Sequence, residues 1–420
     1  MHPMLDQLSP ELMRVLRSAV QLAPAPIWLV GGLVRDLLLG KPVVRDLDLA
    51  IEAPVEQLAT QLAAALGGRV LAMHAAFGTA TIELDKPPLL IDLARARAER
   101  YPRPAALPEV RPASMAEDLF RRDFTLNALA APLALSGDQL VVSELLDPYG
   151  GLADLRDGLL RVIHPASFRD DPTRILRGLR LAARLGLGLA PATRQALDQA
   201  LQAGYLGLLS AERVRNELCL ALDEPRPDAV LALSDTWGVT PQIHPELRWS
   251  AATQQRFAQL PNAQHRIHNA QPAALAAGLL TYDMPAAARD ELVARYRLPN
   301  SVGRPLHELG AARLALASIG PELTDSAIDK LLGGFNVEAL VVVNYAEQLP
   351  ACDLIARYLA EIRRVTPLLN GADLRALGVA PGPMLGRLLA DLRAARIDGL
   401  VASRDDELAW VAAQNLKSEI

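Results

Sequence analysis

The chain has 420 residues, of which 51% are hydrophobic and 22% are charged, and its formal net charge is −5. This composition excludes a disordered chain, and the length excludes a single hydrophobic core, because cores stop growing at about 250–300 residues. The two cysteines, Cys219 and Cys352, exclude a disulfide framework, and no apolar run is long enough to span a bilayer. We therefore expect a cytoplasmic, multidomain protein without a secretory signal or a membrane segment.

The first third of the chain predicts alternating strands and helices. Ser9 can cap a helix over 10–20 that has Pro10 at its first position. The next predicted elements are, in order, a strand at 27–32, a helix at 33–40, a strand at 43–53, a helix at 54–68 and paired strands at 77–84 and 89–97. This alternation indicates a small sheet with covering helices.

Beyond about residue 150 the strand pattern fades, and helical periodicity broken by Gly and Pro replaces it. A loop is predicted between helical blocks at 294–305. We therefore predict an α+β fold class, with a head at 1–145, a helical neck at 146–220 and a helical body and tail at 221–420.

Two carboxylates interrupt the apolar strand at 43–53. Asp46 and Asp48 are two residues apart, so both side chains point from one face of a strand. Carboxylates this close repel each other, and burying them is costly. A divalent cation such as Mg²⁺ removes the repulsion, since it binds carboxylate oxygens and takes waters and substrate phosphates as further ligands. The alternative is a turn aspartate beside an exposed one.

Neighbouring residues favour the metal site. Gly31 and Gly32 lie between a strand and a helix, where backbone N–H groups can bind a phosphate, and Arg35 follows in the first turn. This pattern predicts a nucleoside triphosphate with metal. A third carboxylate would complete a two-metal site. Asp92, which also interrupts an apolar strand, is the first candidate, and Glu83 is the second.

Five motifs follow one another between about residues 25 and 220. They are "GGLVRDLLLGKPVVRDLDLA", "RRDFTLNALA", "DPYGGLADLRDGLLRVI", "FRDDPTRILRGLRLAARLG" and "LSAERVRNEL". Together they resemble the tRNA nucleotidyltransferase and poly(A) polymerase family, in its bacterial-type (class II) branch of the polymerase-β-like superfamily. The resemblance implies a polymerase-β-like nucleotidyltransferase head, followed by an all-helical neck, body and tail.

The resemblance also implies roles for the residues in these motifs. Asp46 and Asp48 would hold two Mg²⁺ ions, and Asp92 would be the third catalytic carboxylate. The nucleotide-binding residues of the head would be Gly31, Gly32, Arg35, Arg122 and Asp123.

In the neck, the resemblance implies that Asp171 and Arg174 read the base. A carboxylate accepts from an exocyclic amine and a guanidinium donates to the ring, so the pair would select CTP and ATP over UTP and GTP. The plain alternative is an aspartate that balances a helix dipole. Arg177 and Arg180 continue the three-residue spacing and would contact the triphosphate. Two positions depart from the family pattern: Asp170 replaces Glu, and Leu181 replaces an aromatic residue.

The predicted function is the addition of C and A residues to the tRNA 3′ end, with Mg²⁺ as cofactor, ATP and CTP as substrates and no protein partner implied. Segment 95–110 lies where the family has a flexible loop, and its presence speaks against an enzyme that adds only CC. The alternatives are an enzyme that adds only the final A, a poly(A) polymerase and a non-catalytic RNA-binding protein. Retention of Asp46 and Asp48 argues against the last of these.

Overall fold

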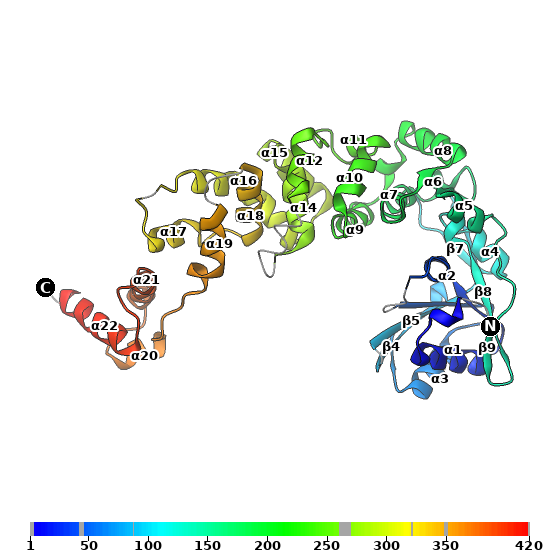
Figure 1. Ribbon diagram of the computed structural model, residues 1–420, viewed down its shortest axis with the longest axis horizontal. Helices are drawn as coiled ribbons and strands as arrows, with labels where there is room; N and C mark the ends of the chain where they lie inside the picture. Colours follow the sequence, from blue (N-terminus) through cyan, green and yellow to red (C-terminus); the bar gives the residue numbers. More distant parts are fainter. Residues whose placement is uncertain are drawn as a thin grey trace. The chain divides into compact units, whose positions relative to one another are not determined.

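The computed structural model describes residues 4–41, 46–86, 88–259, 270–320, 322–347 and 352–418. Its chain divides into two compact units, Met1–Ser210 and Ala211–Ile420 (Figure 1). The predicted boundary at 145/146 lies inside the first unit, and the one at 220/221 lies inside α9 (Ala211–Leu222) of the second. The division into head, neck and body therefore stays a prediction.

A mixed β-sheet organises the first unit, with the strand order β3-β4-β5-β2-β1-β8-β9. The strands are β1 (Ile27–Val30), β2 (Asp46–Ile51), β3 (Arg69–His74), β4 (Thr79–Asp85), β5 (Pro88–Arg95), β8 (Ala130–Ser136) and β9 (Gln139–Val142). Neighbouring strands are antiparallel except for β2 and β5, which run parallel. This mixed sheet beside helices confirms the predicted α+β class.

The two faces of the sheet differ in what covers them. On one face, α1 (Pro10–Leu22), α2 (Gly32–Leu38) and α3 (Glu56–Leu66) bury a large aliphatic core that includes Leu47, Leu49 and Ile51 of β2. Figure 1 shows α1 and α3 side by side under the sheet. Because side chains alternate along a strand, the residues between those three point to the other face. On that face, among the described residues, α4 (Met115–Phe120) packs on Trp28 and Val30 in a small cluster.

Shorter elements complete the first unit. They are the hairpin β6 (Arg97–Arg100) and β7 (Glu109–Pro112), the parallel pair β10 (Leu159–Leu160) and β11 (Gly188–Leu189), the helices α5 (Gly151–Asp157), α6 (Ser167–Asp170), α7 (Thr173–Leu185) and α8 (Pro191–Gln202), and the 3₁₀ turns η1 (Leu5–Gln7), η2 (Ala75–Phe77), η3 (Thr125–Asn127) and η4 (Tyr205–Leu208).

Buried polar contacts join the helices after residue 150 to the sheet. The Asp154 carboxylate accepts hydrogen bonds from the Thr125 hydroxyl at 2.6 Å and from Arg161 Nε at 2.9 Å. Asp154 is 4% exposed, so its side of this ion pair is desolvated. The fully buried ring of Phe124 packs on Gly178 of α7, where a Cβ would lie 2.9 Å from the ring. The first helices of the predicted neck thus belong to the same compact unit as the sheet.

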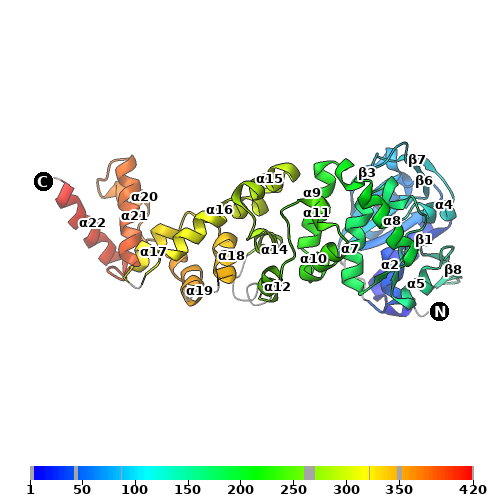
Figure 2. The ribbon, with the colours of Figure 1, turned by 90° about the horizontal axis from the view of Figure 1, so that it is seen from above.

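The second unit is helical throughout its described residues, as predicted (Figure 2). Its elements after α9 are α10 (Pro227–Thr236), α11 (Thr240–Ile243), α12 (Ala251–Ala258), α14 (Pro272–Thr281), α15 (Ala286–Tyr296), α16 (Asn300–Ala317), α17 (Asp325–Leu332), α18 (Val337–Glu347), α19 (Cys352–Ala360), η5 (Ile362–Arg364), α20 (Gly371–Ala376), α21 (Pro383–Ile397) and α22 (Arg404–Ser418). One core surrounds α14, α16 and α18, and a smaller one joins the last three helices. None of the described helices is long and apolar enough to cross a membrane.

Most of the segment predicted as a loop, 294–305, is helical, and only residues 297–299 lie between the two helices. α15 continues to Tyr296, Arg297 closes it in the left-handed conformation with φ of 48°, and α16 begins at Asn300. Pro305 lies inside α16. The helix tolerates it because the apolar residues around it, such as Leu306 and Leu309, are buried in the core.

Replacing Gly151 by Ala tests the junction between the sheet and α5. A Cβ at Gly151 would collide with the Thr125 carbonyl oxygen, which is backbone and cannot swing away. We expect the variant to lose about 2 kcal/mol of unfolding free energy in urea denaturation. Gly207→Ala is the matched control in the same unit, because a Cβ there meets nothing within 4 Å. Equal stabilities of the two variants would contradict the close packing of this junction.

Candidate active site

The predicted carboxylates meet where β2 and β5 run parallel. Asp48 lies directly opposite Asp92 in the register, and Asp46 lies opposite Leu90. All three carboxylates project from the sheet face away from the large core, because Leu47, Leu49, Ile91 and Leu93 occupy the positions between and beside them on the core face. The first three residues of the predicted strand, 43–45, lie outside the described residues.

Glu83, the second candidate for the third carboxylate, lies further from the Asp46 and Asp48 pair than Asp92 does, because β5 separates its strand from β2. Glu83 lies on β4, and its Oε2 accepts a hydrogen bond from Arg69 Nε at 2.6 Å. Asp92 is adjacent to Asp48 and accepts from the Thr81 hydroxyl at 2.6 Å. The geometry therefore favours Asp92 over Glu83 as the companion of the aspartate pair.

Burial and neighbouring charges raise the pKa of Asp48. Desolvation is the larger cause, followed by the negative charge of Asp92 and, more weakly, that of Asp46. The positive charge of Arg122 partly offsets them. Within the described ranges, no group of three or more His, Cys, Asp or Glu side chains is close enough together to hold a metal ion. A cation bound between Asp46 and Asp48 would therefore take further ligands from outside this group.

Gly31 forms the sharp turn between β1 and α2. Its φ of 69° and ψ of −138° suit glycine, and its N–H donates to the Leu129 carbonyl at 3.0 Å. A Cβ at Gly31 would lie 2.6 Å from Nη1 of Arg122. The turn thus brings the backbone directly against a guanidinium. Arg122 is anchored by Asp118, which accepts from its Nη2 at 3.0 Å, and burial lowers the pKa of Arg122.

Arg35 is placed differently from the sequence-based expectation. Its side chain is almost fully buried, with Nε and Nη2 donating to Asp36 at 2.9 and 2.8 Å and Nη1 donating to Asn127 Oδ1 at 2.5 Å. A guanidinium with these partners is held in place. This arrangement favours a positioning role for Arg35, which supports the Gly31 turn, over direct contact with a phosphate.

A buried chain of hydrogen bonds connects this turn to α7. Asn127 accepts from Arg35, and its Nδ2 donates to Asp123 Oδ1 at 3.0 Å. Asp123 Oδ2 in turn accepts from Arg177 Nη2 at 2.7 Å. Burial alone would raise the pKa of Asp123, but Arg177, Asn127 and Arg174 outweigh it and lower that pKa to about 2. The polar side chains of the "RRDFTLNALA" segment therefore tie the sheet to the helix that carries the base-reading candidates.

Asp171 and Arg174 lie close together, but only Arg174 lies on a helix. Asp171 has an extended backbone just before α7, and it accepts from the Thr173 amide at 3.0 Å. Arg174 lies on α7 and is 2% exposed. Its Nη1 donates to Ser167 Oγ at 2.7 Å and its Nη2 to the Arg121 carbonyl at 2.6 Å.

Among the described residues, Arg174 Nε has no hydrogen-bond acceptor. This buried donor lies 4.0 Å from Asp171 Oδ2. A donor and an acceptor thus lie side by side, which is the arrangement needed to read the edge of a base. Arg177 Nη1 also approaches Asp171 Oδ2, at 3.8 Å, and Arg180 lies half-buried one turn further along α7.

Sequence reasoning missed several residues of this site. Asn127 was visible only as the polar end of an apolar run, and Asp118 resembled a solvated helix start. Tyr101 lies on the tip between β6 and β7, with its ring centroid 6.0 Å from the Arg174 guanidinium carbon. Its hydroxyl donates to Glu99 at 2.8 Å. The signal that could have found Tyr101 is an aromatic residue within an otherwise polar, proline-rich loop.

A family model, related sequences and solved structures all match this chain to nucleotide-adding enzymes. Residues 27–161 match the family model described as the poly A polymerase head domain. An A-adding tRNA nucleotidyltransferase of Aquifex aeolicus is 43% identical over 55% of this chain, and the chain spans only 27% of that protein. A CC-adding tRNA nucleotidyltransferase of Deinococcus radiodurans is 37% identical over 90% of this chain and 87% of that protein.

A solved structure resembles the whole described fold. It is the Thermotoga maritima CCA-adding enzyme complexed with tRNA, with a TM-score of 0.70, 25% identity and coverage of 98% of this chain and 97% of that one.

The depressed pKa of Asp123 predicts an acid-dependent loss of stability. Since the folded pKa is about 2 and the unfolded value is about 3.9, the stabilisation is complete above pH ~5 and is lost as the pH falls towards 2. We expect Asp123→Asn to be less stable than the parent protein at pH 7, with the difference shrinking by about 2 kcal/mol at pH ~2 in urea unfolding. Asp198, an exposed aspartate that pairs with Arg194, gives the control. The unfolding free energy of Asp198→Asn should depend on pH as that of the parent protein does. A constant difference for Asp123→Asn across this range would contradict the ion pair with Arg177.

Proposed function

We propose, from the premise that this chain belongs to the tRNA nucleotidyltransferase and poly(A) polymerase family, that it adds nucleotides from CTP or ATP to the 3′ end of tRNA and releases pyrophosphate. The observation that carries this proposal is the convergence of two parts of the first unit. The carboxylates of β2 and β5 lie on one sheet face. The hydrogen-bond chain through Asp123 links the Gly31 turn to Arg177 on α7, the helix that also carries Arg174.

The donor set suits Mg²⁺. Asp46 and Asp48, with Asp92 beside them, offer hard carboxylate oxygens. The pKa of Asp48 is raised by burial first and by repulsion from Asp92 and Asp46 second, and a divalent cation would relieve that repulsion. The remaining ligands would be triphosphate oxygens and water, as is common for Mg²⁺ in proteins. When bound, two such ions would promote ionisation of the RNA 3′-hydroxyl and neutralise charge on the triphosphate.

The surrounding residues of the chain would hold the nucleotide. The Gly31 turn and the adjacent Arg122 would face its phosphates, and Arg35 would keep that turn in shape through Asp36 and Asn127. Arg177, whose side chain is 39% exposed, keeps one edge in contact with Asp123 and can turn another to a phosphate. Because the chemistry is a direct displacement, positioning and charge compensation account for most of the catalysis.

Base selection would depend on Asp171 and Arg174. CTP and ATP carry an exocyclic amine that a carboxylate can accept from, and a ring nitrogen that a guanidinium can donate to. UTP and GTP present a carbonyl and a ring N–H in those places. The unpaired Nε of Arg174 beside Asp171 supports this assignment.

The second unit would bind the body of the tRNA, in keeping with the Thermotoga maritima relative, whose structure contains tRNA. Shape and phosphate contacts dominate recognition of folded RNA, so arginine side chains on its helices are the expected contacts. The cytoplasmic location stays a prediction.

Three products remain in competition. The similar proteins are named A-adding, CC-adding and CCA-adding. Segment 95–110, which argued against CC addition alone, runs from the end of β5 through β6 and the tip into the start of β7. The CC-adding relative matches 90% of this chain, so the experiment below also tests for addition of CC alone.

Primer extension separates these products. The chain would be incubated with tRNA ending before CCA, after C and after CC, with CTP and ATP supplied separately. We expect extension of all three by the appropriate nucleotide. Extension of only the CC-ended tRNA identifies an A-adding enzyme, and extension only up to CC identifies a CC-adding enzyme. Long A tails on unrelated RNA would identify a poly(A) polymerase.

Removing one carboxylate tests the catalytic assignment. Asp46→Ala should lower nucleotide incorporation by roughly 10³-fold while tRNA binding survives, because the side chain is exposed and outside the core. Asp85→Ala, an exposed aspartate at the end of β4, is the matched control and should retain activity. Full incorporation by Asp46→Ala would disprove the metal site.

Replacing Arg174 tests base selection. Arg174→Lys keeps the charge but loses the planar fork, so discrimination against UTP and GTP should fall by about 10- to 100-fold. The measurement is the ratio of kcat/KM for CTP to that for UTP. Arg194→Lys, an exposed arginine on α8, is the control. Unchanged selectivity in a folded Arg174→Lys protein would contradict the base-reading role.

A further inference from the structure

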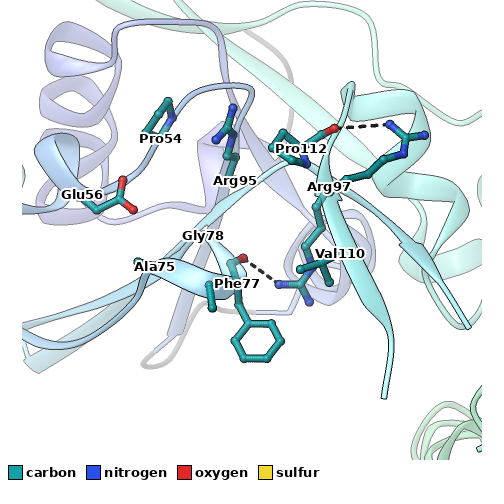
Figure 3. Close-up of a pocket in the computed structure, with 11 residues that line it drawn as sticks. Pro54, Glu56, Ala75, Phe77, Gly78, Arg95, Arg97, Val110 and Pro112 are labelled. Atoms are coloured by element: carbon teal, nitrogen blue, oxygen red, sulfur yellow. Dashed lines mark hydrogen bonds between the residues drawn. The ribbon is translucent and has the colours of Figure 1, made fainter. Parts of the chain in front are cut away.

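A cleft lies at the end of β5, away from the catalytic carboxylates. It has a volume of about 160 Å³, which is the space of about five water molecules. Its walls are the η2 turn with Gly78, the end of β5, strand β7 and the residues before α3. We call it the Phe77 cleft, after the aromatic residue at its edge. Figure 3 shows this arrangement.

The Phe77 cleft is separate from the candidate active site because it opens on a different side of the sheet. Arg95 is paired in register with Ile51, whose side chain faces the large core. Asp92 is an odd number of residues away from Arg95 on the same strand, so their side chains leave opposite faces. A ligand in the cleft therefore does not occupy the position of the nucleotide.

An aromatic ring and a guanidinium form one end of the cleft. The exposed fraction of Phe77 is 49%, which is unusual for so large an apolar residue. Arg97 donates to the Phe77 carbonyl at 3.1 Å, and its guanidinium carbon lies 6.0 Å from the ring centroid. Glu99 holds Arg97 with hydrogen bonds of 3.0 and 3.2 Å. The ring is thus supported from one side and leaves apolar surface for a partner.

Arg95 lines the cleft beside the Gly78 turn. In the described part of the chain, its guanidinium makes no hydrogen bond or ion pair. Gly78 lies against it with φ of 59°, and a Cβ there would lie 2.9 Å from Arg95 Cβ, so glycine leaves room for this side chain. Arg111, on β7, pairs with Glu117 at 2.7 Å, but both side chains are well exposed and such pairs exchange partners easily.

We propose that the Phe77 cleft binds a single-stranded RNA segment, with a base stacked on Phe77 and a backbone phosphate paired with Arg95. Figure 3 shows Phe77 and Arg95 pointing in opposite directions from the turn, so a strand with successive bases and phosphates reaches both, whereas an isolated anion satisfies only Arg95. Aromatic rings beside arginines are the usual platform for unpaired RNA. Glu56, on the opposite wall, directs the phosphates towards the arginines. The choice of RNA as ligand rests on the proposed function.

Fluorescence anisotropy with the full chain and a labelled, short, unstructured oligoribonucleotide tests this inference. Phe77→Ala and Arg95→Gln should each weaken RNA binding about 10-fold, while CTP affinity stays unchanged. Phe77→Trp should bind RNA at least as well as the parent protein, since stacking is retained. Arg95→Gln should also reduce the slope of log affinity against log salt by about 0.7.

Two surface variants of the neighbouring strand β3 are matched controls. Leu71 has the same exposed fraction as Phe77, 49%, and the Arg69 side chain is 72% exposed. Leu71→Ala and Arg69→Gln should leave RNA affinity unchanged.

Unchanged RNA binding in Phe77→Ala and Arg95→Gln would overturn the inference, as would full competition by inorganic phosphate, which indicates a simple anion site. A loss of CTP affinity equal to the loss of RNA affinity would also overturn it, because the cleft would then belong to the nucleotide site. The proposed function is judged separately, by nucleotide incorporation in the parent protein. Absence of incorporation together with weakened RNA binding in the variants would refute the activity and leave the cleft assignment standing.

Discussion

The carboxylate of Asp123 is the contact on which the candidate site depends. One oxygen accepts from Asn127 and the other from Arg177, so this single buried group joins the turn at Gly31 to the helix α7. An ionised carboxylate is costly to bury unless each oxygen is satisfied, and here the cost is offset by charge-assisted hydrogen bonds. The sheet and the neck helix are therefore held in one geometry, and the two halves of the proposed reaction, phosphate chemistry and base selection, share one rigid frame.

The aspartates on β2 and β5 differ from Asp123, because the pKa of Asp48 is raised whereas that of Asp123 is lowered. Asp48 is buried beside Asp92 and Asp46, which oppose its charge, and Arg122 compensates them in part. This part of the site is left electrostatically unfavourable, which is typical of positions that bind a cation or a developing charge. The protein thus neutralises the carboxylate of Asp123, which holds sheet and helix together, and compensates the charge of Asp48 only in part, in the proposed metal site.

Helices and strands that are marked by nearby capping, glycine or alternating apolar residues were predicted from the sequence. Ser9 caps α1, Gly67 ends α3 in the left-handed conformation, and β4 and β5 pair as expected. Strands β3, β8 and β9 were not predicted. β3 and β9 are the two edges of the sheet, and β8 pairs with β1, which is far away in the sequence, so no local pattern indicates this pairing. The loop expected at 294–305 formed helices because burial of the surrounding leucines outweighed the helix-breaking residues.

In the candidate site, too, features with a local sequence signal were predicted and features that depend on distant residues were not. The spacing of Asp46 and Asp48 follows from the strand period, so their common face was predictable, whereas the burial of Arg35 was not, since it depends on Asn127, which is distant in sequence. The extended backbone of Asp171 has no clear local signal, since it directly precedes Pro172, the N-cap of α7.

The unpaired Nε of Arg174 has a thermodynamic consequence. A buried donor without an acceptor costs about 1–3 kcal/mol, and the free protein carries that cost. In the proposed function, a base whose ring nitrogen accepts from Nε removes the penalty, whereas a base with a ring N–H places a second donor against it and leaves both unsatisfied. Discrimination between nucleotides would then arise because the correct base satisfies the buried Nε of Arg174 and the wrong base does not.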